Sequence, residues 1–169
     1  MLDQQTLELI SHSPEQTQRI GQHLASLLGG GEVIGLQGHL GSGKTRLVQG
    51  IARGLGVVGP VTSPTFTLIQ EYPLQVRGLR RLYHVDLYRL ERPTQEALGI
   101  GLDEVLGAAG SVSVVEWAER AESLLPADRL WVWLEFMDHT KRLLRLCGYG
   151  DRAQALVQAL RRGVLGQRL

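Results

Sequence analysis

One glycine-rich segment constrains this chain more than any other feature. Residues 38–45 read Gly-His-Leu-Gly-Ser-Gly-Lys-Thr and fit the phosphate-loop pattern G-x-x-x-x-G-K-[ST]. The apolar run 33–36 predicts a short buried strand before the loop, and Arg46–Leu55 predicts a helix after it. The backbone N–H groups of such a loop and the dipole of the following helix attract anions. The segment therefore predicts a phosphate site, with Lys44 on terminal phosphates and Thr45 on Mg²⁺.

Composition and charge narrow the class of protein. The chain has 169 residues, 43% hydrophobic and 21% charged, which predicts one ordered domain over residues 1–169. A net charge of +1 gives no bulk electrostatic argument for nucleic-acid binding. Cys147 is the only cysteine, so no intramolecular disulfide can form. The N-terminus lacks a signal-peptide pattern and no apolar run could span a bilayer, so we expect a cytoplasmic protein without membrane contact.

The order of expected elements indicates an α/β fold. Strands are predicted over Thr6–Ile10, Val33–Leu36, Thr65–Tyr72, Arg81–Leu87, Val112–Trp117, Leu130–Phe136 and Leu143–Gly148. Helices are predicted over Ser13–Leu28, where Ser13 and Gln16 form a capping box, and over Arg46–Leu55, Pro93–Leu106 and Asp151–Arg162. We expect a P-loop NTPase-like α/β fold with a mixed, mostly parallel central sheet flanked by helices.

Two acids follow apolar strands and compete for one role. Asp86 ends one strand and Glu116 another, and ligands of open α/β sheets bind at that carboxyl edge. Either could hold Mg²⁺ or its waters, and either could instead be an ordinary surface acid. Glu119 is expected to be a solvated helix position. Thr65, after Ser63 and Pro64, could sense a γ-phosphate as a switch residue does, although a plain turn also fits.

Base preference is partly determined by what the chain lacks. Guanine-specific P-loop proteins generally read the base with an Asn-Lys-x-Asp segment, and this chain contains no asparagine. ATP is therefore favoured over GTP. A small-molecule P-loop kinase is an alternative, but it would need a lid with several arginines. The cluster 77–81, Arg-Gly-Leu-Arg-Arg, is the candidate for that lid and fits a hairpin turn better.

Four segments in order resemble one family. They are G-H-L-G-S-G-K-T (38–45), S-P-T-F-T-L (63–68), H-V-D-L-Y-R-L (84–90) and V-E-W (115–117), and the chain is similar to the TsaE (YjeE) family of bacterial P-loop ATPases over roughly residues 13–145. The resemblance implies an accessory ATPase of tRNA threonylcarbamoyladenosine synthesis that acts with the TsaB–TsaD complex. Contact with tRNA would be indirect, through that complex. A non-hydrolytic ATP-binding regulator of the same complex is the remaining alternative.

The resemblance also assigns site residues. It implies that ATP is bound by Pro14, Thr17, Leu40, Gly41, Ser42, Gly43, Lys44, Thr45 and Arg142. It implies Mg²⁺ on Thr45 and Glu116, and it implies catalytic roles for Glu116, Asp86, Lys44 and Thr65. Trp117 is expected to pack against the site. His39 departs from the family, which usually has Asp there, and removes a negative charge near the phosphates.

Overall fold

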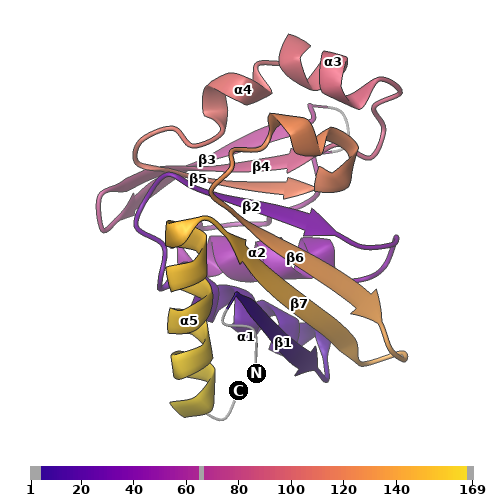
Figure 1. Ribbon diagram of the computed structural model, residues 1–169. Coiled ribbons are helices and arrows are strands. Elements are labelled where there is room, and N and C mark those ends of the chain that lie inside the picture. The colour runs from indigo at the N-terminus through magenta and orange to yellow at the C-terminus, as the bar shows by residue number, and fades with distance from the viewer. Residues whose placement is uncertain (1–4, 65–66, 167–169) are drawn as a thin grey trace.

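The computed structural model describes residues 5–64 and 67–166, and it is organised around one seven-stranded sheet (Figure 1). The strands are β1 Thr6–Ser11, β2 Glu32–Gln37, β3 Ile69–Val76, β4 Leu79–Asp86, β5 Ser111–Glu116, β6 Arg129–Phe136 and β7 Arg142–Tyr149. The helices are α1 Pro14–Ala25, α2 Lys44–Gly54, α3 Pro93–Gly99, α4 Leu102–Val105, the 3₁₀ helix η1 Ala118–Leu124, and α5 Asp151–Gly166.

The sheet is mixed, with strand order β1-β7-β6-β2-β5-β4-β3. The neighbours β6, β2, β5 and β4 run parallel, whereas β1–β7, β7–β6 and β4–β3 are antiparallel. An α/β sheet flanked by helices was expected, but "mostly parallel" describes only its centre. The hairpins β3–β4 and β6–β7 are antiparallel because a short connection can join only antiparallel neighbours. The edge strand β1 comes from the other end of the chain and pairs antiparallel with β7.

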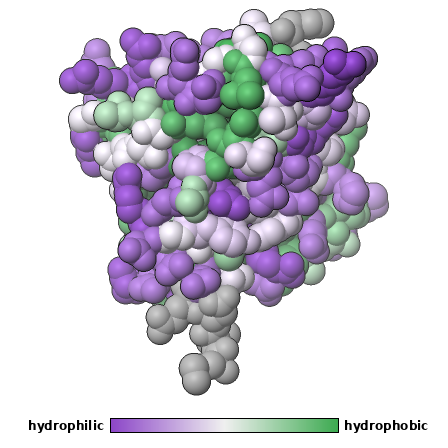
Figure 2. All heavy atoms as spheres, turned by 45° about the horizontal axis from the view of Figure 1, so that its top comes forward, coloured by the Kyte–Doolittle hydropathy of each residue, from purple (hydrophilic) through white to green (hydrophobic). Residues whose placement is uncertain are grey.

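Helices cover both faces of the sheet, as the alternation of side chains along its strands requires. One buried cluster joins α1, α2 and α5 to one face, with Ile34 on β2. The other joins α3, α4 and η1 to the opposite face, with Val33 next to it in sequence. In Figure 1, α3 and α4 lie at the top and α1, α2 and α5 lie below. Figure 2 turns the top forward and shows a small apolar patch among mostly polar side chains.

The first helix begins as its sequence predicts. The Ser13 side chain accepts a hydrogen bond from the Gln16 backbone N–H at 3.0 Å, and the Gln16 side chain accepts one from the His12 N–H at 2.6 Å. This reciprocal pair is the expected capping box. The helix ends at Ala25, three residues before the expected end at Leu28. Two further backbone hydrogen bonds form a turn between this helix and β2.

Helices α1 and α2 pack backbone against backbone. A Cβ added at Gly50 would lie 2.1 Å from the Gln18 carbonyl oxygen, and one at Gly21 would lie 2.6 Å from the Leu47 carbonyl oxygen. Only glycine permits so close an approach. The position of α1 therefore depends directly on that of α2, the helix that follows the phosphate loop.

Two strand boundaries near the site differ from expectation. The strand expected to begin at Thr65 begins at Ile69, where its pairing with Val85 starts, and Thr65 itself lies outside the described residues. The last strand before η1 ends at Glu116 because Trp117 has a left-handed backbone, with φ 58° and ψ 39°. None of the helices within residues 5–64 and 67–166 is long and apolar enough to cross a bilayer.

Candidate nucleotide site

The loop between β2 and α2 is shaped by its glycines. Gly41 and Gly43 have φ of 78° and 103°, a left-handed backbone that side chains rarely adopt. A Cβ added at Gly38 would lie 2.5 Å from both the Leu134 carbonyl oxygen and the Ser42 hydroxyl. These positions require glycine for backbone reasons alone. The loop ends directly at the N-terminus of α2, where unpaired N–H groups favour an anion.

Lys44 is a buried cation held mainly by neutral oxygens. Its side chain is 5% exposed, and Nζ donates to the carbonyls of Gly38 at 2.5 Å and His39 at 3.0 Å. Nζ also lies 4.2 Å from the centroid of the Trp117 indole. Burial lowers the pKa of Lys44, and the nearby carboxylate of Glu116 partly offsets that shift. Within the described residues no carboxylate forms an ion pair with Lys44. Such a cation suits an anionic ligand.

Glu116 is the buried carboxylate of the site. It ends β5 beside Asp86, which ends the parallel neighbour β4 in the same register. Glu116 is 2% exposed. Its Oε1 accepts a hydrogen bond from the Thr45 hydroxyl at 3.0 Å, and its Oε2 lies 2.6 Å from His84 Nε2. The first residues of α2 and the last residue of β5 are thus joined through one carboxylate.

Asp86 is more accessible than Glu116. Its Oδ2 accepts a hydrogen bond from Ser63, and its Oδ1 accepts one from the Tyr88 backbone N–H at 2.9 Å. The Ser63 hydroxyl also lies 3.3 Å from Glu116 Oε2. Ser63 therefore links Asp86 and Glu116, the two acids that are candidates for holding Mg²⁺ or its waters.

A cavity of about 410 Å³ lies over the loop. Ten of the expected site residues line it: Pro14, Thr17, Leu40, Gly41, Gly43, Lys44, Thr45, Asp86, Glu116 and Arg142. Ser42 belongs to the loop but is buried, and its hydroxyl lies 3.4 Å from Lys44 Nζ. Thr65 lies outside the described residues.

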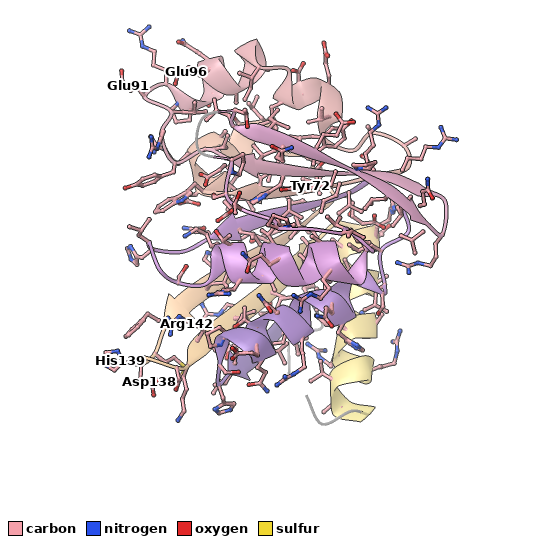
Figure 3. The ribbon with its side chains drawn as sticks, turned by 180° about the vertical axis from the view of Figure 1, so that it is seen from behind. Tyr72, Glu91, Glu96, Asp138, His139 and Arg142 are labelled. Atoms are coloured by element: carbon pink, nitrogen blue, oxygen red, sulfur yellow. The ribbon has the colours of Figure 1, made fainter. Side chains whose placement is uncertain are left out.

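The turn between β6 and β7 forms one wall of the cavity, together with α1. Figure 3 shows Asp138, His139 and Arg142 close together at this edge of the molecule. Arg142 donates to the Gly41 carbonyl at 3.3 Å and to the Asp138 carbonyl at 2.7 Å, and its guanidinium stacks on Phe136. Arg142 is thereby tied to the loop at residues 38–45, and its guanidinium is a group suited to a negatively charged ligand.

Two features of the site were missed from the sequence. In the sequence His84 stands out only as the first residue of the motif at 84–90, although alternation along β4 places it on the same face as Asp86. Glu119 is not fully solvated, because its Oε2 is buried and has no hydrogen-bond partner within the described residues. Burial raises the pKa of Glu119. The left-handed turn at Trp117 redirects the chain so that η1 packs against β2, and no helical periodicity indicates such a turn.

The oxygen donors present fit Mg²⁺. The Thr45 hydroxyl and the Glu116 carboxylate lie at hydrogen-bond distance from each other, and both line the cavity. Mg²⁺ prefers oxygen ligands and is usually held by one or two carboxylates together with phosphates and water. In the part of the chain that the structure describes, no cluster of three or more His, Cys, Asp or Glu side chains could hold a metal by itself. A shared protein–phosphate site is consistent with both observations.

Known proteins resemble this chain over most of its length. The family model "Threonylcarbamoyl adenosine biosynthesis protein TsaE" matches residues 11–144. The Bacillus subtilis protein of that name is 38% identical over 150 residues, covering 89% of this chain and 90% of the relative. The Nostoc protein is 42% identical over 126 residues, covering 70% and 75%. The crystal structure of Bacillus subtilis YdiB superposes with a TM-score of 0.79 at 35% identity, covering 94% of this chain and 95% of that chain. The chain belongs to the TsaE family of threonylcarbamoyl adenosine biosynthesis proteins.

Proposed function

We propose that this protein binds ATP with Mg²⁺ in the cavity over residues 38–45 and hydrolyses it. The buried ammonium of Lys44, which is held mainly by carbonyl oxygens beside the Thr45–Glu116 pair, carries the proposal. We further propose that hydrolysis serves the TsaB–TsaD complex in making threonylcarbamoyladenosine in tRNA. In this proposal tRNA is contacted through that complex, and the protein acts in the cytoplasm.

Different groups of the chain would bind the phosphates and the Mg²⁺ ion. Backbone N–H groups of the loop would surround the β- and γ-phosphates, and Lys44 would exchange its carbonyl partners for phosphate oxygens. Thr45 and Glu116 would hold Mg²⁺, directly or through water, and bound Mg²⁺ neutralises charge that develops on the phosphates. Pro14 and Thr17 on α1 lie at the cavity wall.

The two strand-end acids are the candidates for positioning the attacking water. The water oxygen bonds to the γ-phosphorus, the bond from that phosphorus to the ADP oxygen breaks, and a carboxylate accepts the water proton. Glu116 is deeply buried and accepts a hydrogen bond from Thr45, which supports a role in holding Mg²⁺. Asp86 is less buried, lines the same cavity, and is the alternative group for the proton.

The kinase alternative loses support from the arginine cluster 77–81. The Arg77 guanidinium donates to the Ala25 carbonyl at 2.9 Å, at the end of α1, and Arg81 pairs with Glu71 on the neighbouring strand. None of the three arginines of the cluster, Arg80 included, lines the cavity. An arginine lid over a phosphate acceptor is therefore not supported by this cluster.

ATP turnover measured with and without purified TsaB–TsaD complex tests the proposal. We expect Mg²⁺-dependent release of phosphate that is faster when the complex is present. Tight ATP binding with no turnover in either condition would replace hydrolysis by the non-hydrolytic regulator. Absence of ATP binding in both conditions would overturn the proposal.

A further inference from the structure

His84 is a buried polar side chain that does not line the cavity. It lies on β4, it is fully buried, and its Nε2 is 2.6 Å from Glu116 Oε2. Its other ring nitrogen, Nδ1, is also buried and has no hydrogen-bond partner within the described residues. A buried N–H without an acceptor is costly. The network therefore assigns the ring proton to Nε2, from which it is donated to the Glu116 carboxylate.

Glu116 needs such a donor to keep one position. A glutamate side chain has three rotatable bonds, so its backbone alone does not fix the carboxylate. In this site Oε1 accepts a hydrogen bond from Thr45, and Oε2 lies closer to His84 Nε2, at 2.6 Å, than to the Ser63 hydroxyl, at 3.3 Å. The imidazole has fewer rotatable bonds and is enclosed in the sheet, where β4 and β5 are hydrogen-bonded neighbours. The rigid partner thus determines where the flexible one can lie.

We propose that His84 is a positioning residue: its Nε2–H holds the Glu116 carboxylate so that Oε1 faces Thr45 at the Mg²⁺ position. This inference rests on the proposed function, because it concerns how the same site receives Mg²⁺ with ATP. Partners behind a metal-linked carboxylate typically change metal affinity or activity about 10–100-fold when they are removed.

A matched pair of substitutions separates positioning from packing. His84→Gln keeps an N–H donor near the place of Nε2, whereas His84→Met has similar length and no donor. Affinity for a non-hydrolysable ATP analogue is measured by equilibrium titration, once with Mg²⁺ and once with a chelator. Thermal unfolding without nucleotide checks that both variants are folded.

Positioning predicts a specific pattern in these titrations. Both variants should bind the analogue like the wild type in chelator. The gain in affinity produced by Mg²⁺ should be reduced about 10–100-fold in His84→Met and largely restored in His84→Gln. A folded His84→Met protein whose affinity for the analogue rises with Mg²⁺ as much as that of the wild type would overturn this inference but not the proposed function. A wild-type protein that shows no Mg²⁺ gain would overturn the proposed function as well.

A measurement on the wild-type protein does not depend on the Met variant folding. The ¹⁵N NMR signals of the His84 ring, assigned by their loss in His84→Gln, should show a proton on Nε2 and none on Nδ1. The Nε2 signal should move when Mg²⁺ is added to the analogue complex. A proton on Nδ1 alone, or a signal unaffected by Mg²⁺, would contradict the inference.

Discussion

The Thr45 hydroxyl and Glu116 Oε1 lie 3.0 Å apart although 71 residues separate them in the chain. Thr45 is in the first turn of α2, and Glu116 ends β5. Their contact joins the end of the loop at residues 38–45 to the carboxyl edge of the sheet. The hydroxyl proton satisfies a buried carboxylate oxygen there, and both oxygens are ligand types that Mg²⁺ accepts.

Lys44→Ala is expected to weaken ATP binding without unfolding the protein. A charge-assisted contact is worth about 1.5–3 kcal/mol, so affinity should fall roughly ten- to hundredfold. Equilibrium titration with ATP measures this change. Lys141→Ala is a matched control, because it removes the only other lysine and that residue does not line the cavity. Equal affinities for the two variants would exclude the loop as the phosphate site.

Glu116→Gln is expected to reduce ATP turnover more than ATP binding. The amide keeps the size of the side chain but loses its charge, and groups that position water or accept a proton contribute about 10²–10⁴-fold. Steady-state turnover with TsaB–TsaD present measures the loss. Asp86→Asn is compared in the same assay. Normal turnover in Glu116→Gln together with its loss in Asp86→Asn would reverse the roles of the two acids.

ATP is expected to bind more tightly than GTP. The asparagine-dependent guanine readout cannot occur in a chain that has no asparagine. Competition of unlabelled ATP and GTP against one labelled nucleotide gives the ratio of affinities. If GTP competes as well as ATP does, the cavity recognises the base in another way.

Glu119→Gln is expected to stabilise the protein at neutral pH. Burial raises the pKa of Glu119 in the folded state, although nearby Lys44 and Arg120 oppose the shift. Stability therefore falls as pH rises from the unfolded pKa, about 4.3, through the raised folded pKa, because unfolding then releases a proton. Glutamine has no such loss, so its gain in Tm should be larger at pH 7.5 than at pH 4.

The matched control for that prediction is Glu91→Gln, which makes the same chemical change at an exposed carboxylate. It should change Tm little, and by a similar amount, at both pH values. A gain for Glu119→Gln that is independent of pH would show that removal of the buried charge is not its cause.

Gly50→Ala is expected to destabilise the fold. The added methyl group would meet the Gln18 backbone carbonyl, which cannot rotate away, and overpacking of this kind costs about 1–3 kcal/mol. Gly99→Ala adds the same group at a helical position with nothing within 4 Å and should leave stability unchanged or raise it by about 0.5–1 kcal/mol. Denaturant unfolding compares the two. Equal effects would contradict the close packing of α1 on α2.

The glycine-rich loop between β2 and α2 could be predicted because all its determinants are local: glycines, a lysine and a hydroxyl at fixed spacing between a strand and a helix. The proximity of Asp86 and Glu116 could also be predicted, since both follow apolar strands whose carboxyl ends share one edge. The place of Arg142 beside Gly41 cannot be predicted from local patterns, because it depends on how the β6–β7 turn folds over the loop.

Other parts of the site depend on geometry that residue patterns do not encode. The contact between His84 and Glu116 needs the register of β4 against β5, which hydrophobic alternation leaves open. The partial burial of Glu119 follows from the left-handed backbone at Trp117, a conformation that a bulky residue rarely adopts. The antiparallel edges differ in origin: the β3–β4 hairpin forms one edge, which local turn signals indicate, whereas β1 pairs with β7 from the far end of the chain at the other edge, which no local pattern indicates.

The glycine contacts between α1 and α2 have a mechanical consequence. At Gly21 and Gly50 no side chain separates the two helices, so their backbones are in direct contact. A shift or rotation of α2 is therefore transmitted directly to α1. Pro14 and Thr17, in the first turn of α1, line the same cavity that Lys44 and Thr45 line from α2. The two walls of the cavity therefore move together as one rigid unit. The packing of α1 on α2, which lies outside the cavity, sets the distance between these walls.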